Sequence, residues 1–166
     1  MYTYVARTFI DQGPDTMTMR EKLEEDITQA MRDRDKVRLE ALRFLKAKIQ
    51  DVEKPLGKTL DDPGMLEAIG RQVSDRRDSI RMFEQGGRDD LVAKESAELA
   101  ILITYLPPQL SPEELAQMVS DVIKEVGATS ARDKGKVMGK LMPQVKGKAD
   151  GNAVNEVVTQ LLESGA

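Results

Sequence analysis

The chain has 166 residues, a net charge of −4 and neither cysteine nor histidine. A chain of this length can bury roughly 70% of its unfolded surface, so it can fold without disulfides or metals. The absence of Cys and His excludes disulfides, thiolate nucleophiles, the usual zinc sites and the commonest general base, so we expect no catalytic residue, no metal site and no cofactor.

Residues 1–16 differ from the rest because they hold three of the six aromatic residues and end in a Gly-Pro turn signal. We interpret them as an extension upstream of the natural start or a mobile tail, or alternatively as an edge strand or partner-binding arm built on Tyr2, Tyr4 and Phe9. The chain shows no secretory signal, and its longest apolar run is far shorter than the ~20 residues of a membrane span. We therefore expect a cytoplasmic protein with no membrane partner.

Two helices are predicted over residues 17–56. Thr18 followed by Glu21 makes a capping box, after which apolar residues recur at helical spacing to about residue 33. The next helix carries an apolar stripe from residue 42 to residue 52, and Pro55 and Gly57 then break it. These two helices are expected to form a hairpin.

A second hairpin is predicted over residues 61–106. Asp61 or Asp62 caps its first helix, with Pro63 at the first helical position, where its missing N–H costs nothing. Gly86-Gly87 stops that helix, and another runs from about residue 89 to Leu106. The paired acids at 61–62 and 89–90 lie at helix starts, where the helix dipole explains them without a metal.

Charged residues interrupt the apolar stripes of this second hairpin. Arg76 falls where one helix needs an apolar residue, and Glu95 does so in the other. In an antiparallel hairpin Arg76 lies opposite Glu98, with Glu95 one turn away. An unpaired buried charge would be expensive, so we predict a structural ion pair of Arg76 with these glutamates.

Pro107-Pro108 ends the fourth helix and marks a domain boundary, which divides the chain into residues 17–108 and 109–166. Beyond it, Ser111 caps a fifth helix that closes at Gly127, and Ser130 caps a short sixth helix that is broken at Pro143. Asp150 caps the seventh. The predicted fold is all-α, with a four-helix domain of two helical hairpins followed by a three-helix domain.

A basic, glycine-rich segment covers residues 131–151. Six basic and two acidic residues give it a balance of +4 in a chain that is −4 overall. The residues that we single out as RNA-binding candidates are Lys136, Lys140, Lys146, Lys148, Gly135, Gly139, Gly147 and Gly151. Glycine in a short helix costs about 1 kcal/mol, so it needs a compensating reason. Close helix packing at Gly135 and Gly139 is one reason, and backbone N–H groups exposed beside lysines for a phosphate are the other.

The string GKVMGKLMPQVKGKADGNAVNEVVTQLL resembles the signature of the GatB/YqeY family, which includes the tail of the B subunit of the aspartyl/glutamyl-tRNA amidotransferase. The preceding strings VRLEALRFLKAKIQ and RRDSIRMFEQGGRDDLVAKESAELAILITYLPPQLSPEEL resemble the stand-alone YqeY-like proteins. The resemblance covers residues 17–162. It implies an all-helical protein whose C-terminal part is related to a domain associated with holding the tRNA body.

The resemblance also implies a carbon–nitrogen ligase activity with glutamine as amido-N-donor, although the residues show no autonomous active site, so catalysis stays open. We expect a partner among tRNA or other structured RNA, and amidotransferase or other translation proteins. Aromatic stacking platforms are almost absent, which favours recognition of RNA shape. The alternative is a non-catalytic protein-interaction scaffold with a groove around Met138 and Met142.

Overall fold

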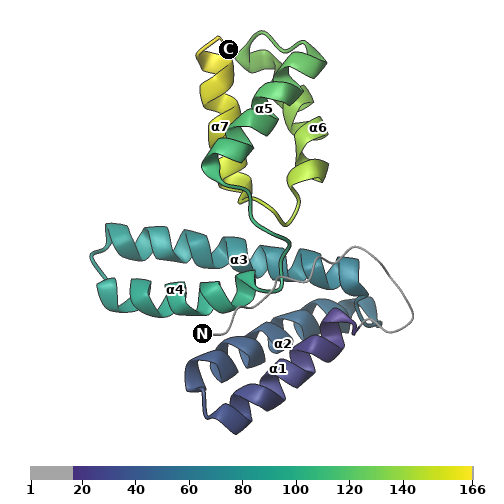
Figure 1. Ribbon diagram of the computed structural model, residues 1–166, viewed down its shortest axis with the longest axis vertical. Coiled ribbons are helices and arrows are strands. Elements are labelled where there is room, and N and C mark those ends of the chain that lie inside the picture. The colour runs from purple at the N-terminus through teal and green to yellow at the C-terminus, as the bar shows by residue number, and fades with distance from the viewer. Residues whose placement is uncertain (1–16, 166) are drawn as a thin grey trace. The chain divides into compact units, whose positions relative to one another are not determined.

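The computed structural model describes residues 17–165, and over that range it contains seven α-helices, one short 3₁₀ turn and no strand (Figure 1). The chain separates into two compact units, one ending at Pro107 and one starting at Pro108. The first unit holds four α-helices and the second holds three. The all-α class and this order of helices are confirmed, whereas the predictions for residues 1–16 lie outside the described residues.

Two helical hairpins make up the first unit. One pairs α1 (Met19–Asp33) with α2 (Lys36–Leu56), and the other pairs α3 (Asp62–Gln85) with α4 (Asp89–Ile103). In Figure 1 the two hairpins approach each other at one end and diverge toward the other.

The core of the first unit forms where the apolar stripes of its four helices meet. Helices α2 and α3 supply most of the side chains that are shielded completely from solvent, and α4 adds Leu102. Burying one such side chain contributes about 1.5–3 kcal/mol. The largest of them are Leu42, Leu45, Ile49, Met65, Ile69 and Leu102.

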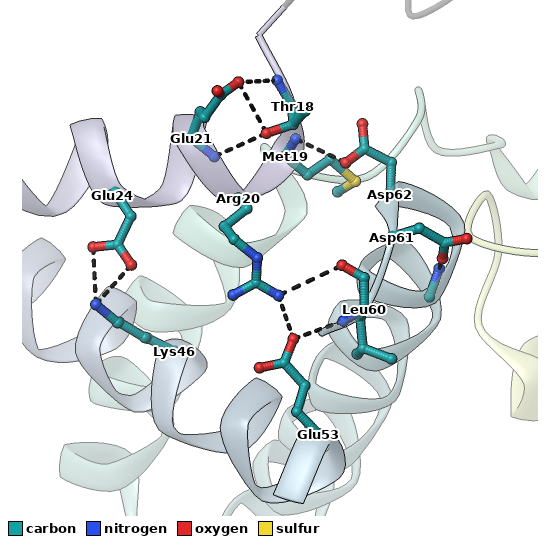
Figure 2. Close-up of polar contacts among 11 residues, drawn as sticks. Thr18, Met19, Arg20, Glu21, Glu24, Lys46, Glu53, Leu60, Asp61 and Asp62 are labelled. Carbon is teal, nitrogen blue, oxygen red and sulfur yellow. Dashed lines mark hydrogen bonds and ion pairs between the residues drawn. The ribbon is translucent and has the colours of Figure 1, made fainter. Parts of the chain in front are cut away.

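Polar contacts tie the start of α1 to the segment between α2 and α3 (Figure 2). The Met19 amide donates to Asp62 Oδ1 at 3.1 Å, and Arg20 forms an ion pair with Glu53. Glu53 Oε1 also accepts from the Leu60 amide at 2.7 Å. One carboxylate therefore holds both the first turn of α1 and the chain entering α3.

Of the two candidates for the cap of α3, Asp61 is the N-cap, because its carboxylate accepts from the Gly64 amide at 3.0 Å. Asp62 is turned instead toward the beginning of α1. Sequence spacing cannot separate two adjacent aspartates, because both can adopt the extended backbone of an N-cap.

The second unit contains α5 (Pro112–Val126), the 3₁₀ turn Ala131–Asp133, α6 (Lys134–Val145) and α7 (Gly151–Glu163), and each α-helix packs against the other two. Its core is aliphatic, and no described residue of this unit buries a charged side chain. The side chains most completely buried in it are Val119, Val137, Leu141, Val145, Val154 and Val158.

Two helix ends differ from the predictions. Helix α4 ends at Ile103 rather than Leu106, and the next residues form tighter turns, because a residue before proline disfavours the helical region. Pro143 does not break α6, which continues to Val145. Proline removes one backbone donor, but Val145 is 1% exposed, so the burial of its side chain holds the last turn in place.

Candidate nucleic-acid interface

Helix α6 divides its residues between core and solvent at a spacing of four. Val137 and Leu141 face the core and are fully buried, which turns the residues one and two positions before them outward. Gly135, Gly139, Lys136 and Lys140 are accordingly all exposed. Four of the eight predicted candidates therefore share the outer face of one helix.

The two glycines on this face have open space beside them. A Cβ atom placed on Gly135 or Gly139 would meet nothing within 4 Å. The close-packing interpretation of this pair is therefore wrong within the described residues, because no other helix approaches them. They leave the backbone of α6 bare toward solvent.

The two lysines on this face reach to the C-terminal end of α5. Lys136 Nζ donates to the Val126 carbonyl at 2.9 Å, and Lys140 forms an ion pair with Glu125. The last carbonyls of a helix attract cations, which accounts for the position of Lys136. Because the ion pair with Glu125 is exposed, it leaves Lys140 available to exchange partners with a phosphate.

The loop from α6 to α7 carries the remaining candidates. Lys146 and Lys148 are exposed, and Gly147 has a φ of +74°, a conformation that favours glycine. The amides of Lys148 and Ala149 both donate to the Val145 carbonyl, at 2.8 and 3.1 Å. These donors are already used, which contradicts the prediction that the loop exposes them for a phosphate.

The start of α7 is capped from within the chain. Asp150 is the N-cap, and its Oδ1 accepts from the Asn152 amide at 3.2 Å, with Gly151 as the first helical residue. A carboxylate therefore stands where an anion would bind at a helix N-terminus. The lysine side chains, rather than the backbone N–H groups, are what this loop offers to a phosphate.

The loop is also fastened to the segment that enters the second unit. Gln109 Nε2 donates to the Gly147 carbonyl at 2.7 Å, and the Leu110 amide donates to the Lys148 carbonyl at 2.8 Å. Sequence analysis missed both contacts, because they join residues almost forty positions apart and leave no periodic signal. They fix the position of the loop within its unit.

One acidic residue remains ionised next to the lysines. Hydrogen bonds from the backbone amides of Thr129 and Ser130 lower the pKa of Asp133, and the charge of Lys136 lowers it further. Lys134, which the predictions did not include, turns away from this region and donates to Thr159 Oγ1 at 2.8 Å. The positive side chains of the interface are thus Lys136, Lys140, Lys146 and Lys148.

In the first unit, the structure brings Arg76, Glu95 and Glu98 together. Arg76 Nη1 lies 2.6 Å from an oxygen of each glutamate. The side chains of Arg76 and Glu98 are 8% and 10% exposed, and that of Glu95 is 22% exposed. The cluster registers α3 against α4 at the level of one helical turn.

Within residues 17–165, no α-helix is both long and apolar enough to cross a bilayer. The same residues place no three acidic side chains where they could share a metal ion. Ser79, the hydroxyl nearest the Arg76 cluster in sequence, donates to the Asp75 carbonyl at 3.0 Å, a bond typical of serine within a helix.

Comparison with known proteins gives a consistent match. A family model described as Yqey-like protein matches residues 20–162. A relative from Pyrenophora tritici-repentis named altered inheritance of mitochondria protein 41, mitochondrial, is 30% identical over 146 residues, which is 85% of this chain and 79% of the relative. Proteins of the same name from Eremothecium gossypii and Saccharomyces cerevisiae are 34% and 30% identical. Those alignments cover 64% and 76% of this chain, and 60% and 70% of the relatives.

These names overturn one prediction. The relatives are named as mitochondrial proteins, which contradicts the cytoplasmic location expected from the sequence. The expectation rested on the absence of a secretory signal and of a membrane span, and neither absence distinguishes the cytoplasm from an organelle.

Proposed function

The chain is a member of the YqeY-like family, and on that premise we propose that it is an accessory protein that binds structured RNA, with tRNA as the first candidate. The proposed interface is the outer face of α6 together with the loop that follows it. The residues proposed to contact RNA there are Lys136, Lys140, Lys146, Lys148, Gly135 and Gly139.

The observation that carries this proposal is a strip of bare helix backbone flanked by exposed lysines. Lysine contacts to phosphates supply affinity without reading sequence, and helix positions without side chains let a sugar–phosphate backbone come close. The charge of the second unit is segregated to suit this role. Outside residues 131–151 it holds one lysine against six acidic residues, so an RNA backbone is attracted to one region and repelled from the rest.

The class of RNA follows from a compositional fact. Residues 108–166 contain no Phe, Tyr or Trp. Proteins that bind single strands stack the bases on aromatic rings, whereas folded RNA is recognised through its backbone and shape. The second unit thus suits a folded RNA better than a single strand.

The resemblance to the amidotransferase tail extends the proposal to a partner. The protein would act beside a glutamine-dependent amidotransferase on a misacylated tRNA, and the carbon–nitrogen ligase chemistry would belong to that enzyme. Adding the chain to an amidation assay should change the yield of amidated tRNA. An unchanged yield at saturating protein would argue against this partner while leaving RNA binding to its own test.

Direct binding is tested with fluorescently labelled tRNA over a salt series. Changing Lys136, Lys140, Lys146 and Lys148 together to Ala should weaken binding at least tenfold and flatten the salt dependence by roughly 0.7–0.9 log units per lost phosphate contact. A matched control changes four exposed lysines of the first unit, Lys36, Lys54, Lys58 and Lys94. Equal loss in both variants would show that total charge, and not this interface, governs binding.

The alternative of a protein-interaction scaffold rested on Met138 and Met142. Met138 packs against the core of the second unit, whereas Met142 is exposed, so the two do not share one face of α6. Affinity purification that enriches a protein partner without RNA would nevertheless favour the scaffold over the RNA-binding proposal.

A further inference from the structure

A groove of about 460 Å³ opens between the two hairpins of the first unit. Helix α2 contributes Phe44 to it, α3 contributes Asp75 and Arg76, and α4 contributes Glu95 and Glu98. Its volume lies within the roughly 300–1,000 Å³ that is typical of sites for organic ligands. The RNA-binding proposal does not use this groove.

The base of the groove carries more carboxylates than cations. A single nitrogen of Arg76 serves both Glu95 and Glu98, so one guanidinium faces two negative charges. Asp75 adds another carboxylate to the lining. Lys94 does little to balance them, because its Nζ lies 4.0 Å from Glu98 and its side chain is 62% exposed. A cationic group would find acceptors there in a partly desolvated place.

The same arginine has a donor with no acceptor. Arg76 Nε is buried and makes no hydrogen bond, although the side chain is more than nine-tenths buried. Native proteins seldom leave a buried N–H unpaired, and an oxygen supplied by a ligand is one way to satisfy it. The groove therefore lacks both a cation and a carbonyl or carboxylate oxygen.

An exposed aromatic ring lies against these groups. Phe44 is 46% exposed, and its centroid lies 5.3 Å from both Arg76 Cζ and Lys48 Nζ. The face of such a ring attracts cations and also packs against aliphatic chains. Because half of the ring is in solvent, it can turn aside and uncover the guanidinium beneath it.

We propose that this groove binds a short peptide segment of a partner protein that carries an arginine or a lysine. The cation lies between Glu95 and Asp75, its aliphatic stem packs on Phe44, and a backbone carbonyl oxygen accepts from Arg76 Nε. Charge complementarity selects this occupant. A free polyamine offers no oxygen, a simple anion offers no cation, and a peptide offers both.

The test uses the full chain, isotopically labelled for NMR, and the blocked peptide acetyl-Ala-Arg-Leu-Ala-amide. Backbone shifts should be confined to residues 40–48, 72–79 and 94–98. The matched peptide with citrulline in place of arginine keeps the shape and loses the charge, so it should bind about tenfold more weakly. Spermidine and acetate serve as ligands that offer only the cation or only the oxygen.

Glu95→Gln in the protein should weaken binding of the arginine peptide by about tenfold, and Phe44→Leu should weaken it less. Glu125→Gln, which removes an acid from the second unit, should leave it unchanged. Equal binding of the arginine and citrulline peptides, shifts outside the groove, or full binding to a Glu95→Gln variant with a native spectrum would overturn the proposal. Spermidine binding as tightly as the peptide would overturn the peptide as occupant.

Discussion

The two units of this chain handle charge in opposite ways. Within residues 17–165 the only buried charged side chains are Arg76 and Glu98, and both belong to the first unit. The second unit has an aliphatic core and keeps its lysines exposed on α6 and the loop that follows. Charges in the first unit therefore contribute mainly to which helices pair, and charges in the second are available to a ligand.

Asp26 shows the first pattern beside the Arg76 cluster. Its carboxylate accepts from Lys22 at 2.7 Å, from Arg38 at 2.9 Å and from the hydroxyl of Tyr105. Tyr105 follows α4, so one carboxylate joins the first hairpin to the end of the second. No cluster of comparable reach occurs among the described residues of the second unit.

The largest expected effect comes from breaking the Arg76 cluster. Arg76→Ala leaves Glu98 buried without its partner and should lower the free energy of unfolding by about 3–5 kcal/mol. Urea unfolding followed by circular dichroism measures this change. Replacing Arg76, Glu95 and Glu98 together by leucine should restore most of the loss, because well-packed apolar residues substitute for a buried ion pair. A small effect of Arg76→Ala would mean that water already satisfies these groups.

The next effect concerns Asp26 and is dependent on pH. Partial burial alone would raise the pKa of Asp26, but hydrogen bonds from Lys22 and Tyr105 and the charges of Lys22 and Arg38 outweigh it and lower the pKa. A lowered folded pKa gives stability that is present above the unfolded value, about 3.9, and is lost as the pH falls through the folded pKa.

Asp26→Asn should therefore cost about 1–3 kcal/mol at pH 7 and much less near pH 2. Urea titrations at several pH values between these limits measure the difference. A constant difference between variant and parent at all pH values would contradict the ionised carboxylate as its source.

A smaller effect of opposite sign is expected on α6. Gly135→Ala and Gly139→Ala should each stabilise the chain by about 0.4–1 kcal/mol, because both positions are helical and open. The same changes should weaken tRNA binding if the RNA backbone approaches the bare helix. Thermal unfolding and the tRNA titration measure the two quantities separately. Destabilisation by either change would restore the packing interpretation.

The smallest expected effect is at the ion pair between Lys140 and Glu125. Glu125→Gln releases the lysine and removes a negative charge, so tRNA affinity should rise by about twofold while stability changes by less than about 1 kcal/mol. Glu163→Gln, on α7, removes the same charge elsewhere on the unit and serves as the control. A rise of equal size in the control would assign the effect to net charge.

Local signals predicted most of the fold. Thr18 with Glu21 and Ser111 with Glu114 form reciprocal capping boxes where the sequence placed them, and Gly127 closes α5 in the left-handed conformation. These features lie within four residues of the backbone groups that they satisfy, so spacing alone identifies them. The prediction failed at Pro143, where tertiary burial outweighs a local rule.

Contacts between distant residues were harder to predict. The apolar stripes indicated that Arg76 would face Glu98 because a hairpin with a known turn fixes the register of its two helices. No such constraint links Asp26 to Tyr105, which are 79 residues apart, or Lys140 to Glu125. Periodicity assigns a residue to a face of its helix, but it does not say which other helix will cover that face.

The hydrogen bond from the Leu110 amide to the Lys148 carbonyl turns one backbone position into a reporter. An amide exchanges its hydrogen with solvent when its bond opens, so the exchange rate at Leu110 measures how often the loop after α6 separates from the incoming chain. A ligand that clamps the loop slows this exchange, and one that remodels the loop accelerates it. Hydrogen–deuterium exchange at this single residue can therefore distinguish a rigid docking surface from an adaptable one.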